Sequence, residues 1–271
     1  MLQILPSSAW VEFRGAPQTK TFNQGALHFA IVRGDDGKER KCAVKLIDLA
    51  TRPGLLCEGL GWLLAQASGV NVPPFAAVLR VPLAELGQAM TLPAFVAGHS
   101  EYLGWCVEIV DGNAIAQVNR WLFWIARAQC LKAKNTSVIA AFDYWADNQD
   151  RNYGNVIRSK DGQYVAIDHE TLLHETVWST YTNLQFKLNS LLKEAEATLS
   201  PNQLHLFRCS MALAAKDHLA AISTAKMAGL KFTQDLIPDT AFATQLWSEI
   251  ETFLTLRAQV DWLSRELGVI V

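Results

Sequence analysis

The sequence lacks the features that mark several large classes of protein. Its 271 residues carry a formal charge of only −2 and no polybasic cluster, which argues against a nucleic-acid-binding surface as the main role. There is no internal repeat, low-complexity tract or long run of one charge. The one long uncharged stretch, residues 59–79, is broken by Asn71, Pro73 and Pro74, so no membrane span is predicted.

Paired cysteines and an export signal are also missing. The five cysteines are scattered and never form a C-x-x-C pair, so neither a disulfide framework nor a zinc site is expected. Residues 1–6 lack a positively charged leader, and their apolar run is too short for a signal peptide. These absences predict a soluble, cytoplasmic protein without a membrane partner. The 50% hydrophobic content, with nine tryptophans, is enough for a sizeable core.

One polar stretch, residues 142–170, carries a spacing that indicates chemistry. Asn155 follows Asp150 by five positions, and Asp168 comes thirteen later. Phosphoryl transfer to a hydroxyl needs a carboxylate that accepts a proton, together with oxygen ligands that hold Mg²⁺ against the ATP phosphates. The spacing resembles that of protein kinases, which place a catalytic-loop Asp, an Asn five residues on and a metal-binding Asp on the next hairpin, and this resemblance implies Asp150 as catalytic base and Asn155 and Asp168 as metal ligands. The alternative is an Asp/Asn-rich turn and surface hairpin with solvated carboxylates.

The pattern around these residues predicts how they meet. Residues 138–145 are typical of the end of an apolar helix, and 147–154 of a polar loop. Two short strands, 155–158 and 164–167, flank an Asp-Gly turn, so we expect a hairpin with Asn155 and Asp168 at its open end.

A second pair has the same spacing. Asp147 and Asn152 are also five positions apart. We prefer Asp150 and Asn155, because Asn155 opens the strand directly and follows Gly154, which permits a close backbone approach.

A lysine and a glutamate earlier in the chain are candidates for nucleotide binding. Residues 41–46 predict a strand with Lys45 in its middle, and residues 54–68 predict an amphipathic helix on which Glu58 is the only charge. A lone carboxylate on an apolar helix needs a partner, and Lys45 is the natural one. An exposed lysine and a glutamate favoured by the helix dipole are the alternatives. The loop 21–26 has a single glycine and is equally compatible with a phosphate loop or an ordinary turn.

The remaining pattern predicts an α+β protein with two lobes. Strands are expected at 10–13, 26–32, 70–79, 90–96 and 105–110, and helices at 118–131, 202–227 and 241–267. We therefore expect a β-rich, nucleotide-binding N-lobe over residues 1–105 and a helical C-lobe with the catalytic and metal-binding loops over residues 106–271.

These motifs in this order resemble the HipA-like branch of the protein-kinase-like fold. The resemblance covers roughly residues 20–175 and rests on Lys45, Glu58 in EGLGWLLAQASGVNVPP, FDYWADNQDRNYGN and VAIDHE. Residues 150–155 also resemble the catalytic loop of phosphoinositide kinases. The resemblance implies a bilobal fold, in which Lys45 binds the ATP phosphates and Glu58 orients it. It also implies a protein substrate with a Ser or Thr acceptor, and leaves a toxin role and an antitoxin-like partner protein open.

Some positions depart from the family pattern. Asn152 stands where relatives usually have Lys or His, so the charge of the γ-phosphate must be neutralised elsewhere, with Arg151 as the nearest cation in sequence. His169-Glu170 replaces the usual Phe-Gly, and there is no A-P-E signature. A small-molecule or lipid kinase, or a non-catalytic nucleotide-binding module, therefore stays open as an alternative.

Overall fold

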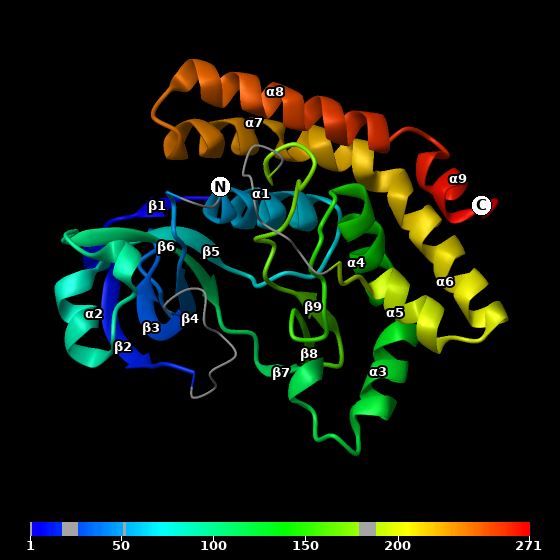
Figure 1. Cartoon of the computed structure of the whole chain (residues 1–271), viewed down its shortest axis with the longest axis horizontal. Helices are drawn as coiled ribbons and strands as arrows, with labels where there is room; N and C mark the ends of the chain where they lie inside the picture. Colours follow the sequence, from blue (N-terminus) through cyan, green and yellow to red (C-terminus); the bar gives the residue numbers. More distant parts are fainter. Residues whose placement is uncertain (1, 18–26, 51–52, 179–187) are drawn as a thin grey trace. The chain divides into compact units, whose positions relative to one another are not determined.

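The computed structural model describes residues 2–17, 27–50, 53–178 and 188–271. The chain is α+β and divides into two compact units (Figure 1). The first consists of Met1–Gly59 and Pro73–Ile109, and the second of Leu60–Val72 and Val110–Val271. No helix in the described ranges is long and apolar enough to cross a membrane. The predicted loop 21–26 lies outside the described residues.

A six-stranded mixed sheet forms the first unit, in the order β1-β5-β6-β4-β3-β2 (Figure 1). Only the short β1 pairs in parallel, with β5, and the other pairings are antiparallel. The strands are β1 (Ile4–Leu5), β2 (Trp10–Gly15), β3 (Leu27–Arg33), β4 (Glu39–Leu46), β5 (Ala76–Pro82) and β6 (Glu101–Glu108).

Side-chain alternation gives this sheet two different faces. On β4, Cys42, Val44 and Leu46 are fully buried in the core of the unit, together with alternate residues of β3, β5 and β6. Lys41, Ala43 and Lys45 consequently lie on the other face of the same strand. The predicted strand at 41–46 is confirmed, and its alternation places Lys45 opposite the core.

Two predicted strands of this unit differ from the structure. Residues 70–75 are not in a strand, and β5 begins only at Ala76, because Pro73 and Pro74 cannot donate to a β-ladder. The strand predicted at 90–96 is wrong. The chain there follows the short helix α2 (Leu83–Ala89) and contains a 3₁₀ turn, Ala94–Val96, that begins after Pro93.

The second unit contains a small antiparallel sheet, β7-β8-β9, built on the predicted hairpin. Its strands are β7 (Gly112–Ala114), β8 (Val156–Ser159) and β9 (Tyr164–Ala166). The turn closes through a hydrogen bond from Gly162 N to Ser159 O, 2.9 Å, with Gly162 at a φ of 82° that favours glycine. The hairpin prediction is confirmed, although the first and last predicted residues lie just outside the strands.

Helices make up the rest of this unit, and helix α1 (Gly54–Ala67) begins in the first unit and continues into it. The predicted helix at 118–131 starts later, and the two predicted near the C-terminus are each interrupted, at 215–217 and 258–261. Figure 1 shows α7 and α8 side by side, and the Trp247 ring of α8 lies against Gly229 of α7. The helices are α3 (Phe123–Lys132), α4 (Lys134–Trp145), α5 (Leu191–Thr198), α6 (Pro201–Ala214), α7 (His218–Leu236), α8 (Thr240–Arg257) and α9 (Trp262–Leu267).

Candidate active site

Lys45 and Glu58 meet inside the first unit. The Lys45 Nζ lies 3.5 Å from the Glu58 Oε1. The glutamate side chain is almost fully buried, whereas 22% of the lysine side chain is exposed. Because a buried carboxylate is costly unless it is paired, α1 and β4 are mutually constrained at this point. The expected pairing is thus present, with the ammonium on the partly open side.

An open pocket lies on the same face of the sheet. It has a volume of about 370 Å³, and two of its residues, Phe29 and Lys41, share the Lys45 face according to the strand register. Phe29 and Ile109 offer an apolar surface, while Lys41 and Arg14 add positive charge. Lys41 precedes Lys45 by four strand residues, about 13 Å along β4. The pocket residues are Arg14, Phe29, Ala30, Lys41 and Ile109.

A buried ion pair organises the loop after α4 in the second unit. Arg151 is fully buried, and its Nε and Nη2 donate to Asp143 at 2.9 and 3.0 Å in a two-point contact. Its Nη1 donates to the carbonyls of Asn155, at 3.2 Å, and Ile167. The Arg151 guanidinium thereby connects helix α4, the loop after it and the two residues that flank the hairpin strands at their open end. Arg151 is consequently no candidate for neutralising a γ-phosphate, contrary to the suggestion of the sequence.

Asp150 lies on this loop with one carboxylate oxygen held and the other available. Its Oδ1 accepts from Asn152 Nδ2 at 3.0 Å and from Asn189 Nδ2 at 2.7 Å. In the described part of the chain no hydrogen bond reaches Oδ2. The backbone also forms a parallel bridge between Asp150 and Asn189, with Arg151 N donating to Asn189 O. Sequence reasoning missed Asn189, since nothing local marks a residue 39 positions away.

The competing pair serves to shape the loop. Asp147 is buried in the left-handed region at φ 54°, and its two oxygens accept from Gln149 Nε2 at 2.6 Å and Glu175 N at 2.8 Å. The Asn152 Oδ1 accepts from Gly154 N at 2.7 Å. Both polar ends of Asn152 and both oxygens of Asp147 are therefore committed to local structure. This geometry favours the Asp150–Asn155 pair as the chemically available one.

Asn155 and Asp168 lie at the open end of the hairpin. The Asn155 carbonyl accepts from Ile167 N at 3.1 Å, so the next residue, Asp168, follows directly from this pairing. The Asn155 side-chain nitrogen donates to Asp150 O at 2.8 Å, which assigns the amide oxygen as its remaining acceptor. Asp168 has a φ of 62°, a left-handed conformation that Asp tolerates better than most residues. The backbone thus links Asn155 directly to Asp150 and, through Ile167, to the residue before Asp168.

His169 packs this network against α1. A Cβ placed on Gly61 would lie 2.4 Å from the His169 Cβ, so the helix and the loop that follows β9 fit only because Gly61 has no side chain. The His169 ring is edge-on to Phe142, with centroids 5.9 Å apart. Burial lowers the pKa of His169 well below 6.5, and the nearby Arg151 adds to the shift, so the imidazole is neutral. The buried, neutral His169 ring therefore packs as an apolar side chain would.

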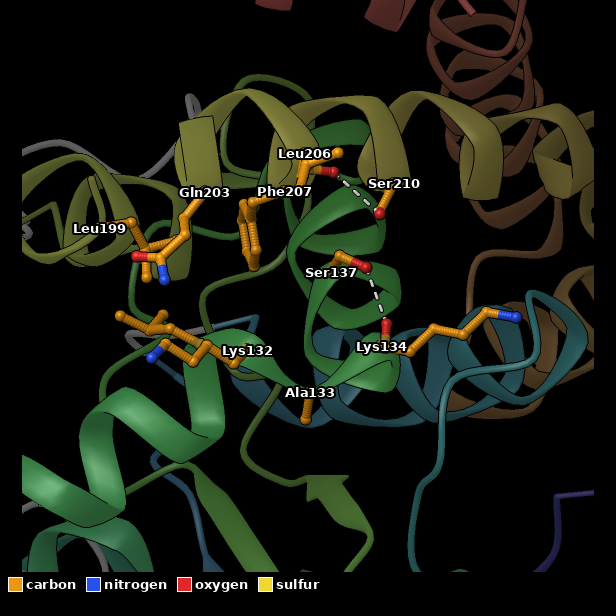
Figure 2. A pocket seen from close by; sticks show the side chains of 10 residues that line it. Lys132, Ala133, Lys134, Ser137, Leu199, Gln203, Leu206, Phe207 and Ser210 are labelled. Carbon is orange, nitrogen blue, oxygen red and sulfur yellow. Dashed lines mark hydrogen bonds between the residues drawn. The ribbon is translucent and has the colours of Figure 1, made fainter. Parts of the chain in front are cut away.

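Another pocket in this unit contains none of the predicted site residues. It has a volume of about 160 Å³ and lies between the α3–α4 junction and α5–α6 (Figure 2). Its two serine hydroxyls already donate to helix carbonyls, from Ser137 to Lys134 and from Ser210 to Leu206. We therefore assign it no part in the candidate site.

Two further observations bear on the site. Within the described ranges, no group of three or more His, Cys, Asp or Glu residues is arranged to hold a metal ion, so a metal here would depend on Asn155 and Asp168 together with ligand oxygens. No protein-family model matches the sequence, and no curated protein is a significant match.

Proposed function

We propose that this chain is an ATP- and Mg²⁺-dependent phosphotransferase that acts on an alcohol group, as a HipA-like Ser/Thr protein kinase does. The observation that carries the proposal is the double link made by Asn155: its Nδ2 donates to Asp150 O, and its carbonyl accepts from Ile167 N, the residue before Asp168. Phosphoryl transfer to a hydroxyl uses a base and metal ligands held near one another in this way.

Asp150 is proposed as the catalytic base. Two asparagine amides hold its Oδ1 and therefore fix the plane of the carboxylate. This leaves Oδ2 to accept a hydrogen bond, and then a proton, from the acceptor hydroxyl. A positioned base of this kind contributes at least about a hundredfold to the rate.

Asn155 and Asp168 are proposed as the protein ligands of Mg²⁺. One amide oxygen and one carboxylate suit a cation that prefers oxygen ligands and usually keeps waters or phosphate oxygens in its shell. When bound, the metal would neutralise charge on the phosphates. Arg151 keeps the two ligand-bearing strand ends in register, since its guanidinium binds the carbonyls of Asn155 and Ile167.

Lys45 is proposed to bind the ATP phosphates, with Glu58 orienting its ammonium at 3.5 Å. The open pocket on the same sheet face offers an apolar surface for the base at Phe29, which pairs with Ala43 two residues from Lys45, and at Ile109, whose N–H donates to the carbonyl of Lys41 four residues from Lys45. The pocket thus extends along the strand away from Lys45, as a nucleotide with its base and phosphates at opposite ends requires.

The acceptor is proposed to be a Ser or Thr hydroxyl on a protein, including sites on this chain. Of the hydroxyl residues near the N-terminus, Ser7 and Ser8 lie in a 3₁₀ turn, and Ser7 donates to Glu101. Thr176 donates to the Leu173 carbonyl at 3.2 Å, while Ser179 and Thr180 lie outside the described residues.

Labelled ATP with Mg²⁺, incubated with the purified protein alone and with cell lysate, tests this function. We expect label on protein Ser or Thr, and a loss of at least about a hundredfold in Asp150→Asn with ATP affinity retained. Asp147→Asn, checked for an unchanged melting temperature, is the matched control. Loss of transfer in folded Asp147→Asn but not in Asp150→Asn would show that the other pair is catalytic. Label found only on metabolites or lipids would favour a small-molecule or lipid kinase, and no transfer with intact ATP binding would favour a binding module.

A further inference from the structure

The start of α3 exposes an unusual concentration of large apolar side chains. Trp121 is 87% exposed and Trp124 is 68% exposed, and Leu122 and Ile125 are each 55% exposed. A tryptophan can bury about 150–250 Å² on contact, so the two tryptophans alone approach the size of the largest apolar patch on a typical monomer. Exposed apolar patches of this size usually mark a site that binds a protein, a membrane or a ligand. In Figure 1 the segment is the loop that leads from β7 into α3.

These side chains are presented by an anchored element. The N–H groups of the two residues after Arg120 donate to Asn119, one to its side chain at 3.0 Å and one to its carbonyl at 2.8 Å. The Phe123 ring lies edge-on to Tyr153 at 5.6 Å, and Arg127 pairs with Glu194 at 2.6 Å. The exposure is thus a property of a well-held helix start, which lowers the entropy cost of binding.

The same surface is positively charged. Residues 112–142 contain no Asp or Glu, although they contain four cations. Arg127 is neutralised by Glu194, but the other three form no ion pair within the described part of the chain. Arg158 of β8 adds a further cation beside α3 through Gln129, at 3.3 Å. The four cations within 112–142 are Arg120, Arg127, Lys132 and Lys134.

Apolar and basic residues are arranged in sequence along the helix. Ile125 and Lys132 fall on one stripe of α3, because their separation of seven residues corresponds to about two helical turns. The stripe is apolar at its start, beside the turn that carries Trp121, and basic about 10 Å further along. A ligand that fits it must place apolar groups at one end and negative charge at the other.

We propose that this surface binds a protein segment that combines apolar side chains with carboxylates. The α3 surface is defined here as Arg120, Trp121, Leu122, Trp124, Ile125 and Lys132. Self-association would bring its cations against one another, which disfavours a second copy. A lipid surface would favour several cations around the apolar tip, whereas of the cations without an ion pair in the described residues only Arg120 lies there and Lys132 lies at the far end of the helix. Tryptophan and arginine are also the residues most enriched at protein-binding hot spots. The inference does not rest on phosphoryl transfer.

Fluorescence anisotropy with a labelled peptide of mixed Leu, Phe, Asp and Glu residues tests the proposal. We expect the full chain to bind it, and Trp121→Ala/Trp124→Ala to weaken binding at least about tenfold. A peptide with Asn and Gln in place of Asp and Glu should bind several-fold more weakly, and Lys132→Glu should lower affinity for the acidic peptide only. Met227→Ala/Leu256→Ala removes two apolar side chains elsewhere that are also more than 60% exposed, and this variant should bind as the wild type does.

Three results would overturn the proposal. The first is equal binding by the tryptophan double variant and the wild type, with both folded by circular dichroism. The second is concentration-dependent dimerisation that the double variant abolishes, which would assign the surface to a second copy. The third is binding to phosphatidylcholine–phosphatidylserine vesicles that depends on the tryptophans, without binding of the acidic peptide, which would assign it to a lipid surface.

Discussion

Gly61 provides a sharp test of how the loop with the proposed metal ligand Asp168 is held, because two opposing effects act at one position. In the interior of a helix, replacing glycine by alanine normally stabilises by about 1 kcal/mol. At Gly61, however, the new Cβ would lie 2.4 Å from the His169 Cβ and 2.8 Å from its Cγ. Real Cβ atoms do not approach so closely, so either α1 or the His169 loop must move.

The relative size of these two effects decides whether Gly61→Ala stabilises or destabilises the protein. Overpacking a filled interior costs about 1–3 kcal/mol, and a contact this close to a Cβ belongs in the upper part of that range. After the helix gain is subtracted, we expect Gly61→Ala to lower the free energy of unfolding by about 1–2 kcal/mol. Because His169 directly follows Asp168, the same substitution should weaken Mg²⁺-dependent ATP binding without touching a ligand residue.

Gly87→Ala is the matched control for this prediction. Gly87 also lies in a helix, but its added Cβ would meet only the flexible end of Leu92, at 3.2 Å. We expect that variant to be as stable as the wild type or up to about 1 kcal/mol more stable. Urea titration followed by tryptophan fluorescence would measure both, with calorimetry of an ATP analogue for binding. A Gly61→Ala protein at least as stable as the wild type would refute the assigned contact between α1 and His169.

The other predictions concern the buried pair, the acid sensitivity and the metal. Asp143→Asn should lower the free energy of unfolding by about 3–5 kcal/mol, since it leaves Arg151 buried without a counter-charge. A structural role for Arg151 would be contradicted if the Arg151→Lys variant lost phosphoryl transfer while its stability stayed unchanged. Burial lowers the pKa of His218 from 6.5 to about 3, so its stabilising contribution is complete above pH 6.5 and is lost as the pH falls toward 3. Between pH 7 and 5, the free energy of unfolding measured by urea titration should therefore fall by about 2 kcal/mol more in the wild type than in His218→Phe, which retains stacking on Trp145. Equal losses in the two proteins would argue against this role of His218. Asp168→Asn should remove the Mg²⁺ dependence of ATP-analogue binding measured by calorimetry, and an unchanged dependence would exclude Asp168 as a ligand.

The local sequence pattern was sufficient to predict those features that short-range interactions determine. The alternation of residues 41–46 located Lys45 opposite the core, and the Asp-Gly turn located the hairpin that aligns Asn155 with Ile167. The apolar periodicity of 54–68 located the helix that carries Glu58, and the lone charge on that helix indicated its partner. Apart from the Lys45–Glu58 pairing, which spans 13 residues, each of these outcomes depends on neighbours only a few residues away or on the two faces of one strand.

Only the tertiary structure decided the features that depend on contacts between residues far apart in the sequence. Arg151 looked like an available cation, yet Asp143 and two carbonyls enclose it, and no local signal distinguishes these outcomes. Asn189 reaches Asp150 from 39 residues away, and Gly61 accommodates a histidine more than a hundred residues later. Burial is a property of everything packed around a side chain, so sequence alone determined which residues carry the proposed chemistry, while only the fold decided which of them remain available for it.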